Sequence, residues 1–151
     1  MMYLLDTNVL LRLRDLDDPR RSDCIAAVDR LTEQSHTLVV CAQVLIEFWA
    51  VATRPRNVNG MGLAIEDVLR ELDELRRVFP CLPEPPDIAA RWRQVVVDHG
   101  VMGRQAHDAR IVALMQAHGI AHIVTLNVDD FTRYQGITPF SPQEAFDQFP
   151  I

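Results

Sequence analysis

Short apolar runs alternate with longer segments of helical periodicity along the chain. The runs Tyr3–Leu5, Thr37–Val40 and Ile123–Thr125 are rich in apolar or β-branched residues, and we interpret them as buried strands. Asp6-Thr7-Asn8 directly follows the first run and resembles a helix cap. A strand that passes into a capped helix is typical of an α/β unit.

Six segments have apolar spacings of three and four residues, which predicts helices over 9–14, 21–34, 43–54, 63–79, 86–99 and 104–118. The clearest apolar stripes are Ile25, Val28, Leu31; Val44, Phe48, Val51; Ile65, Val68, Leu69, Leu72, Leu75; and Ile111, Leu114, Met115. Residues 54–62 read as a loop, 80–86 as an extended proline-rich connection with room for a short strand, and 127–134 as a loop with a helical turn. The tail, 137–151, has an expected edge strand and a last helical turn.

Strands that alternate with helices predict an α/β fold, with a short, mainly parallel sheet and helices on both faces. The sequence contains neither internal repeats nor a composition break. We therefore expect a single domain over residues 1–151, in which helix dominates.

The composition is that of an ordinary globular protein, with 48% hydrophobic and 24% charged residues, which excludes a mainly disordered chain. Gln43 and Glu47 interrupt the apolar stretch 38–52, so no membrane span of roughly 20 apolar residues is expected. We also expect no signal peptide. Three cysteines without close spacing argue against a disulfide framework or a cysteine zinc site and favour a reducing, cytoplasmic location.

All 15 basic residues are arginine, because the sequence contains no lysine. This absence excludes P-loop phosphate binding, Schiff-base chemistry and pyridoxal-phosphate catalysis, each of which needs a lysine. The formal net charge is −6, which does not suit a general nucleic-acid coat protein. It leaves open a local arginine patch that binds nucleic acid, or clustered carboxylates that bind divalent cations.

Three acidic residues stand at positions where a carboxylate has chemical interest. Asp6 follows the first strand, at the sheet edge where open α/β folds bind ligands, although it also suits a helix cap. The spacing of Glu47 directs it toward an apolar helix face, where an ionised carboxylate is costly unless it is paired. The alternative is that Glu47 lies at the rim of the helix and reaches water. Asp108 lies near the start of its helix, where an interaction with the helix dipole is the simpler explanation.

Asn127, Asp129 and Asp130 follow the strand that ends at Thr125, again at the ligand-binding edge, although Asn and Asp also serve turns. If these groups converge with the other three acids, their mutual repulsion raises their pKa values and favours a bound cation. Oxygen ligands without Cys or His favour Mg²⁺ or Mn²⁺, which suits phosphoryl chemistry.

At these residues the sequence resembles a PIN domain, the small nuclease domain of the toxins in VapBC-type toxin–antitoxin pairs. The matching segments occur in the family's order and cover essentially the whole chain. They are Leu4–Leu11, Val44–Phe48, His107–Ile111, Ile123–Asn127 and Asp129–Phe131. The chain departs from the family at Asn127, where many PIN domains have an acid.

The resemblance implies a PIN-like three-layer sandwich and a Mg²⁺- or Mn²⁺-dependent endoribonuclease. It implies that Asp6 and Asp108 are the main metal ligands and that Glu47 completes the cage or holds the metal-bound water. Further implied roles are for Asn127 and Asp130 to position that water or a second ion, and for Asn8 and Thr125 to support the acids. The family also implies an RNA substrate, a homodimer, and an antitoxin that inserts a segment near the site.

Four arginines lie near the acid-bearing elements and suit phosphate contacts, namely Arg54, Arg56, Arg104 and Arg110. His107 has a possible catalytic role beside Asp108, but a surface histidine is the simpler interpretation. We interpret Trp49 and Trp92 as core or interface residues, not as platforms for nucleobases.

Two alternatives to a ribonuclease stay open. One is a catalytically weak module that binds RNA or protein without cutting, which Asn127 and the acidic net charge favour. The other is a hydrolase of small phosphate esters on the same metal site. Independently of the reaction, the apolar residues of the 63–79 helix and of the Trp49 face exceed what one small core can bury, which predicts a dimer.

Overall fold

The computed structural model describes residues 1–148, which contain four short strands and seven α-helices. The strands are β1 (Met2–Leu5), β2 (Thr37–Val39), β3 (His122–Val124) and β4 (Thr138–Phe140). The helices are α1 (Thr7–Arg14), α2 (Arg21–Glu33), α3 (Ala42–Thr53), α4 (Ile65–Val78), α5 (Ile88–Asp98), α6 (Gln105–Ala117) and α7 (Pro142–Asp147). Two 3-10 turns, η1 (Arg56–Val58) and η2 (Val128–Asp130), lie in the predicted loops.

The strands form one parallel sheet in the order β2-β1-β3-β4, so β1 and β3 are central and β4 is the edge strand that the tail predicted. Leu5 is in register with Val124, and the Asp6 amide continues the ladder by donating to the Val124 carbonyl at 3.0 Å. The residues that follow β1 and β3 therefore lie side by side at the carboxyl edge of the sheet.

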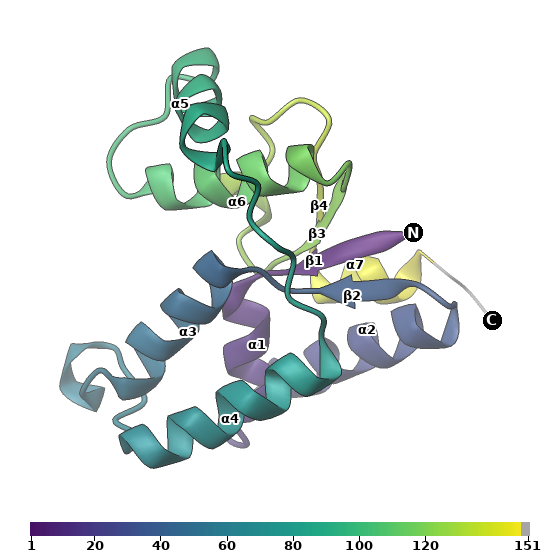
Figure 1. Ribbon diagram of the computed structural model, residues 1–151. Helices are drawn as coiled ribbons and strands as arrows, with labels where there is room; N and C mark the ends of the chain where they lie inside the picture. Colours follow the sequence, from purple (N-terminus) through teal and green to yellow (C-terminus); the bar gives the residue numbers. More distant parts are fainter. Residues whose placement is uncertain (149–151) are drawn as a thin grey trace.

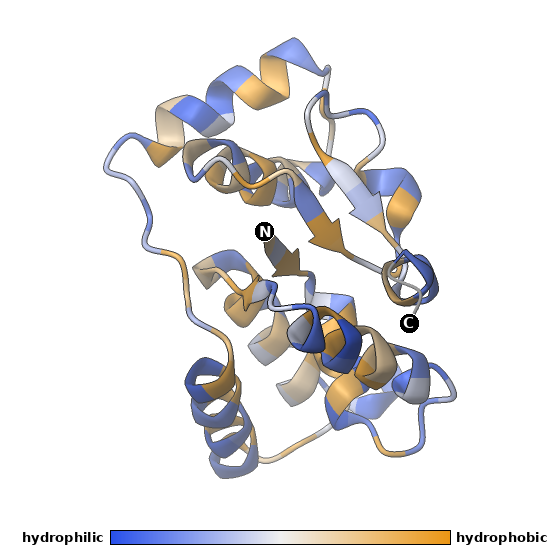
Figure 2. Cartoon of the chain, turned by 90° about the vertical axis from the view of Figure 1, so that its right-hand side faces the viewer, coloured by the Kyte–Doolittle hydropathy of each residue, from blue (hydrophilic) through white to orange (hydrophobic). Residues whose placement is uncertain are grey.

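Helices cover the sheet on both sides, as predicted. Figure 1 shows α5 and α6 on one side of the strands and α1, α2 and α4 on the other. The strands separate these two layers in the side view of Figure 2. Because α3 contacts both α1 and α6, it links the two layers next to the carboxyl edge. The predicted α/β sandwich with a short parallel sheet is confirmed.

The buried apolar residues form one core cluster that includes the central strands and most of α6. The predicted α6 stripe of Ile111, Leu114 and Met115 is buried. In α2, Leu31 is buried as predicted. The other two positions of the predicted stripe, Ile25 and Val28, are only half-buried, and Cys24 and Ala27 are buried beside them. α2 packs against α1 and α7. The small side chains at positions 24 and 27 allow this close packing, and its stabilising effect exceeds what burying the larger Ile25 and Val28 side chains would give.

The apolar residues of α4 divide between the interior and the surface. Val68 and Leu75 are buried, and Leu72 is half-buried. By contrast, Ile65 is 61% exposed and Leu69 is 52% exposed. One face of α4 therefore leaves large apolar side chains in contact with solvent.

Three smaller features bear on the predictions. α1 begins at Thr7, two residues before the predicted start, because Asp6 caps it. In the connection 80–86, where the sequence left room for a short strand, the structure has a single parallel bridge between Val40 and Cys81. All three cysteines are free, and burial raises the pKa of the Cys24 thiol to about 11 and that of Cys41 to about 12.

Within the described part of the chain, no helix has the length and apolar character needed to cross a membrane. The expected single domain over 1–151 stays a prediction, and its last three residues, 149–151, lie outside the described range.

Candidate active site

Asp6 is a buried carboxylate at the carboxyl end of β1, with only 6% of its surface exposed. Its Oδ1 atom accepts a hydrogen bond from the Thr7 amide at 2.7 Å, so Asp6 is the N-cap of α1. Burial is the main cause that raises the pKa of Asp6 to about 6, and the negative charge of Glu47 adds to it. Asp6 is thus the helix cap, and the hydrogen bonds that it accepts offset only part of the cost of burying its charge.

Thr125 and Asn8 hold the other oxygen of Asp6. The buried Thr125 hydroxyl donates to Asp6 Oδ2 at 2.7 Å, and Asn8 Nδ2 donates to the same oxygen at 3.0 Å. Asn8 Oδ1 also accepts from the Leu126 amide at 3.0 Å. These contacts join the segments that follow β1 and β3. Asn8 and Thr125 thus both contact Asp6, and their supporting role in a reaction stays a prediction.

Glu47 lies on α3 and is half-buried. The Thr7 hydroxyl donates to Glu47 Oε2 at 3.1 Å, and Gln43 Nε2 donates to Oε1 at 2.7 Å. Since Thr7 also donates its amide to Asp6, one residue contacts both acids. α3 therefore directs Glu47 toward the start of α1 and toward Asp6.

Asp108 lies in the first turn of α6 and is half-buried. Burial, followed by the negative charges of Asp6, Glu47 and Asp130, raises the pKa of Asp108 to about 7, and Arg104 opposes the shift. These charge interactions identify four acids, from four separate chain segments, as neighbours at the carboxyl edge of the sheet.

The segment after β3 contributes Asn127, Asp129 and Asp130, which differ in exposure. The Asn127 side chain is exposed, and its backbone amide donates to the Thr125 hydroxyl at 3.0 Å. Asp129 is exposed as well, whereas Asp130 is half-buried in the turn η2 and acts electrostatically on Asp108. Of Asp129 and Asp130, only Asp130 is both half-buried and electrostatically coupled to Asp108.

The acidic cluster, meaning Asp6, Glu47, Asp108 and Asp130, suits a hard divalent cation in its chemistry. It offers only oxygen donors, and within residues 1–148 no basic side chain forms an ion pair with any of its members. The pKa values of Asp6 and Asp108 are raised mainly by burial, and the charges of the neighbouring acids add to both shifts. The same part of the chain contains no group of three or more Asp, Glu, His or Cys side chains already close enough together to hold a metal ion.

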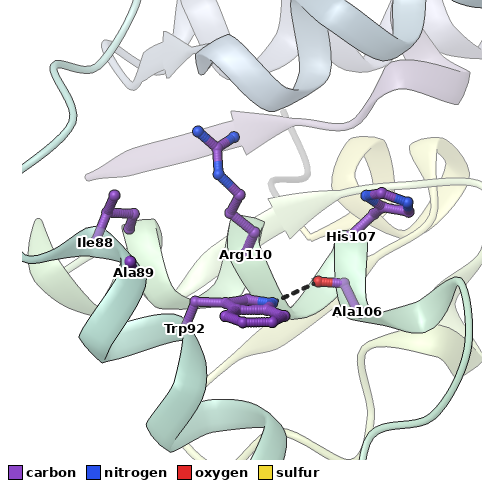
Figure 3. Close-up of a pocket in the computed structure, with 6 residues that line it drawn as sticks. All are labelled: Ile88, Ala89, Trp92, Ala106, His107 and Arg110. Atoms are coloured by element: carbon purple, nitrogen blue, oxygen red, sulfur yellow. Dashed lines mark hydrogen bonds between the residues drawn. The ribbon is translucent and has the colours of Figure 1, made fainter.

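A pocket of about 310 Å³ lies beside the first turn of α6, between α5 and α6. In Figure 3, the Arg110 side chain extends from α6 away from the Trp92 ring, and His107 lies on the opposite side of the pocket from Ile88. The Trp92 indole donates to the Ala106 carbonyl at 2.8 Å and is half-buried against the core, in agreement with the core interpretation of this residue. His107 is exposed at the surface.

The arginines that suited phosphate contacts differ in their surroundings. Both terminal nitrogens of the Arg110 guanidinium have partners. Nη1 donates to Gln43 Oε1 at 2.9 Å, and Nη2 forms an ion pair with Glu84. Arg56 donates to the Met61 carbonyl at 3.2 Å. Arg54 and Arg56 both follow the C-terminal end of α3, whereas Gln43 lies at its N-terminal end. Arg104 is exposed and electrostatically coupled to Asp108, which makes it the arginine best placed for a phosphate.

Sequence reasoning missed Thr7 and Gln43 as parts of this site. Thr7 was interpreted only as part of a cap, and Gln43 only as an interruption of an apolar run. A signal was present for Gln43, because a glutamine four residues before a glutamate on one helix face is placed to contact it. Nothing in the sequence indicated that Thr7 would contact both Asp6 and Glu47.

Comparisons with solved structures show the same fold in VapBC toxin–antitoxin proteins. VapBC-1 from nontypeable Haemophilus influenzae matches with 18% identity and a TM-score of 0.68, covering 94% of this chain and 98% of that one. VapBC2 from Rickettsia felis, bound to a promoter DNA fragment, matches with 16% identity and a TM-score of 0.69, covering 93% and 98%. VapC20 from Mycobacterium tuberculosis, a toxin that cleaves the sarcin-ricin loop, has 18% identity and a TM-score of 0.58 over 82% and 87%.

A search of curated proteins gives no match. The family model of the PIN domain matches residues 3–137, a range that contains all four acids of the cluster. The match agrees with the order of motifs in the sequence and with the parallel sheet that brings their acids to one edge. The chain belongs to the PIN domain family.

Proposed function

We propose that this protein is a Mg²⁺- or Mn²⁺-dependent endoribonuclease that hydrolyses RNA phosphodiester bonds. The observation that carries the proposal is the gathering of four acids around Asp108, whose pKa is raised to about 7 by burial and then by the charges of Asp6, Glu47 and Asp130. Repulsion of this kind is costly for a fold unless a cation occupies the site in the working enzyme. The family membership and the oxygen-only donor set support the same reaction.

Asp6 and Asp108 would be the main ligands of the ion, and Glu47 would complete the set or hold the attacking water. When bound, the ion would supply charge neutralisation at the phosphate and would lower the pKa of that water. Thr7, Asn8 and Thr125 fix the orientation of Asp6 through the hydrogen bonds described above. This orientation would leave little reorganisation to be made during the reaction.

The segment after β3 would face the substrate. Asn127 is exposed and Asp130 is half-buried beside Asp108, so we assign them to positioning the attacking water or a second ion. An asparagine can orient a water but contributes no charge. We therefore expect a second ion to bind more weakly than the first.

We further propose that the protein is the toxin of a VapBC-type pair, with a cognate antitoxin as partner and a homodimer as its working form. The support is the similarity to VapBC structures over nearly the whole length of both chains. An RNA substrate and three free cysteines fit action in the cytoplasm. Production of the chain alone should arrest growth, and co-production of the antitoxin should relieve the arrest.

Asp108→Asn provides the direct test. Within residues 1–148 the Asp108 carboxylate has neither an ion pair nor a hydrogen bond to lose, so the substitution removes charge while leaving the fold intact. We expect cleavage of a mixed RNA pool with Mn²⁺ to fall by at least about 100-fold, because a ligand that stabilises transition-state charge is lost. Undiminished Mn²⁺-dependent cleavage by Asp108→Asn would reject the mechanism.

A catalytically weak RNA-binding module remains the second candidate, favoured by the exposed Asn127 in place of an acid. The same assay separates the two, since a binding module would retain RNA on a filter without producing fragments in Mg²⁺ or Mn²⁺. Turnover of a generic phosphomonoester without RNA scission would instead identify a small-ester hydrolase.

A further inference from the structure

The carboxylate of Glu47 is held from two sides by neutral donors. On one side is the Thr7 hydroxyl at 3.1 Å, and on the other is Gln43 Nε2 at 2.7 Å. Gln43 lies one helical turn before Glu47 on α3, and only 9% of it is exposed. The shorter of the two contacts therefore comes from a buried amide whose orientation matters.

Arg110 determines which end of that amide faces Glu47. Its Nη1 atom donates to Gln43 Oε1 at 2.9 Å. A guanidinium has donors only, so the amide oxygen must face Arg110 and the amide nitrogen is left to face Glu47. A rotated amide would place its oxygen against the carboxylate and would leave Arg110 facing an NH₂ group, and both contacts would be repulsive.

Arg110 is itself fixed in place. Its second nitrogen is paired with Glu84, in the connection between α4 and α5. Because Glu84 offsets the charge of Arg110, the arginine can orient Gln43 without acting as the counter-ion of the acidic cluster. Arg110 also follows Asp108 by two residues on α6, so one helix carries both an acid of the cluster and the group that orients the partner of another acid.

We propose that Arg110 and Gln43 form a relay that positions Glu47 for metal binding and catalysis, an inference that rests on the proposed function. Both are positioning residues, since neither contacts the reacting atoms and Arg110 acts only through Gln43. The relay accounts for a polar residue buried in the apolar run of α3. It also explains how an acid on α3 stays aligned with one on α6, although these helices belong to different parts of the chain.

Paired substitutions by methionine test the relay. Gln43→Met keeps the length of the side chain but cannot donate, and Arg110→Met removes the group that orients the amide. Each should weaken the binding of Mn²⁺ to the RNA-free protein by about 10-fold to 100-fold in titration calorimetry, the usual cost of losing such a supporting partner. On a labelled oligoribonucleotide that the wild-type protein cuts, kcat should fall similarly while KM stays unchanged.

The double variant gives the decisive comparison. If Arg110 acts only through Gln43, Gln43→Met combined with Arg110→Met should lose no more Mn²⁺ affinity than Gln43→Met alone. Arg93→Met, on the exposed side of α5, removes the same charge and should match the wild type in both measurements. If Gln43→Met does not fold, Arg110→Met, at a half-exposed position, decides the question by itself.

Four results would overturn the relay. Losses that multiply in the double variant would show that Arg110 acts independently, and a raised KM with unchanged Mn²⁺ affinity would make it an RNA contact instead. A wild-type protein that binds Mn²⁺ and cuts RNA, with single variants equal to it, would overturn the relay alone. A wild-type protein that does neither would overturn the proposed function and the relay together.

Discussion

The Thr125 hydroxyl donates a hydrogen bond of 2.7 Å to Asp6 Oδ2, although 119 positions separate the two residues. Thr125 is completely buried, and the same hydroxyl accepts from Asn8 Nδ2 at 3.2 Å and from the Asn127 amide at 3.0 Å. One side chain thus connects the segments after β1 and β3, and it links the stability of the sheet edge to the orientation of an acid of the cluster.

Thr125→Val should therefore reduce both stability and activity. Valine keeps the shape but leaves Asp6, Asn8 and Asn127 each without one partner, and we expect a loss of about 1–3 kcal/mol in the free energy of unfolding. Urea denaturation measures the loss, and RNA cleavage should decrease in parallel. Thr125→Ser retains the hydroxyl, so it should remain closer to the wild type in both assays. Equal behaviour of the two variants would contradict the role of the hydroxyl.

The pH dependence of stability should show the uncompensated charge of the acidic cluster. The pKa values of Asp6 and Asp108, about 6 and about 7, lie above the usual 3.8, so the folded state binds protons more tightly than the unfolded state. Without divalent ions, Asp6 and Asp108 should lower the free energy of unfolding as the pH rises from 5 to 7. Burial lowers the pKa values of His36 and His122, so these two histidines act in the opposite direction over the same range. The carboxylates with lowered pKa values, Asp18 and Glu144, lose their stabilising effect only below this window.

Two comparisons check this assignment by thermal melting. Asp108→Asn should reduce the destabilisation between pH 5 and 7, because one of the two acids that cause it is removed. Saturating Mn²⁺ should raise the melting temperature more at pH 8 than at pH 5, since binding competes with protons at acidic pH. Identical pH profiles of the melting temperature for the metal-free wild type and Asp108→Asn would contradict the raised pKa of Asp108.

The loop after α3 depends on the absence of a side chain at Gly60. A Cβ atom there would lie 1.9 Å from the Arg54 carbonyl oxygen, which is impossible without movement of the backbone. Gly60→Ala should open this loop, and trypsin should cut after the exposed Arg56 several times faster than in the wild type. Gly119→Ala is the control for backbone strain elsewhere in the chain. Gly119 has a φ of +65°, but a Cβ there meets nothing within 4 Å, so the loop after α3 should stay closed.

The exposed apolar face of α4 predicts self-association. Ile65 and Leu69 are 61% and 52% exposed. Light scattering at micromolar concentration should therefore give twice the chain mass of 17.2 kDa. Leu69→Asp should reduce the measured mass to that of one chain, whereas Leu16→Asp, on an exposed turn, should not. A wild-type mass of 17.2 kDa would contradict the dimer, and a dimer that survives Leu69→Asp would place the interface on another face.

The spacing of apolar residues and the positions of turn residues predicted most helices and strands, because both depend only on residues that are close together in the chain. The Ile111–Met115 stripe of α6 and the turn near Asp130 could be recognised from spacing and residue type alone. The buried face of α2 could not. Its periodicity favoured Ile25 and Val28, and only the close approach of α1 and α7 explains why Cys24 and Ala27 are buried instead.

The sequence by itself determined the α/β class and the order of the acidic motifs, since both depend on residues that are close together in the chain. Only the tertiary structure decided that Thr7 contacts both Asp6 and Glu47, and that Arg110 reaches Gln43 across 67 positions. Such contacts arise where the parallel register of β1 and β3 and the packing of α3 against α6 bring distant segments together. Hydrophobic periodicity describes which face of an element is buried, but not which polar side chains meet at its end.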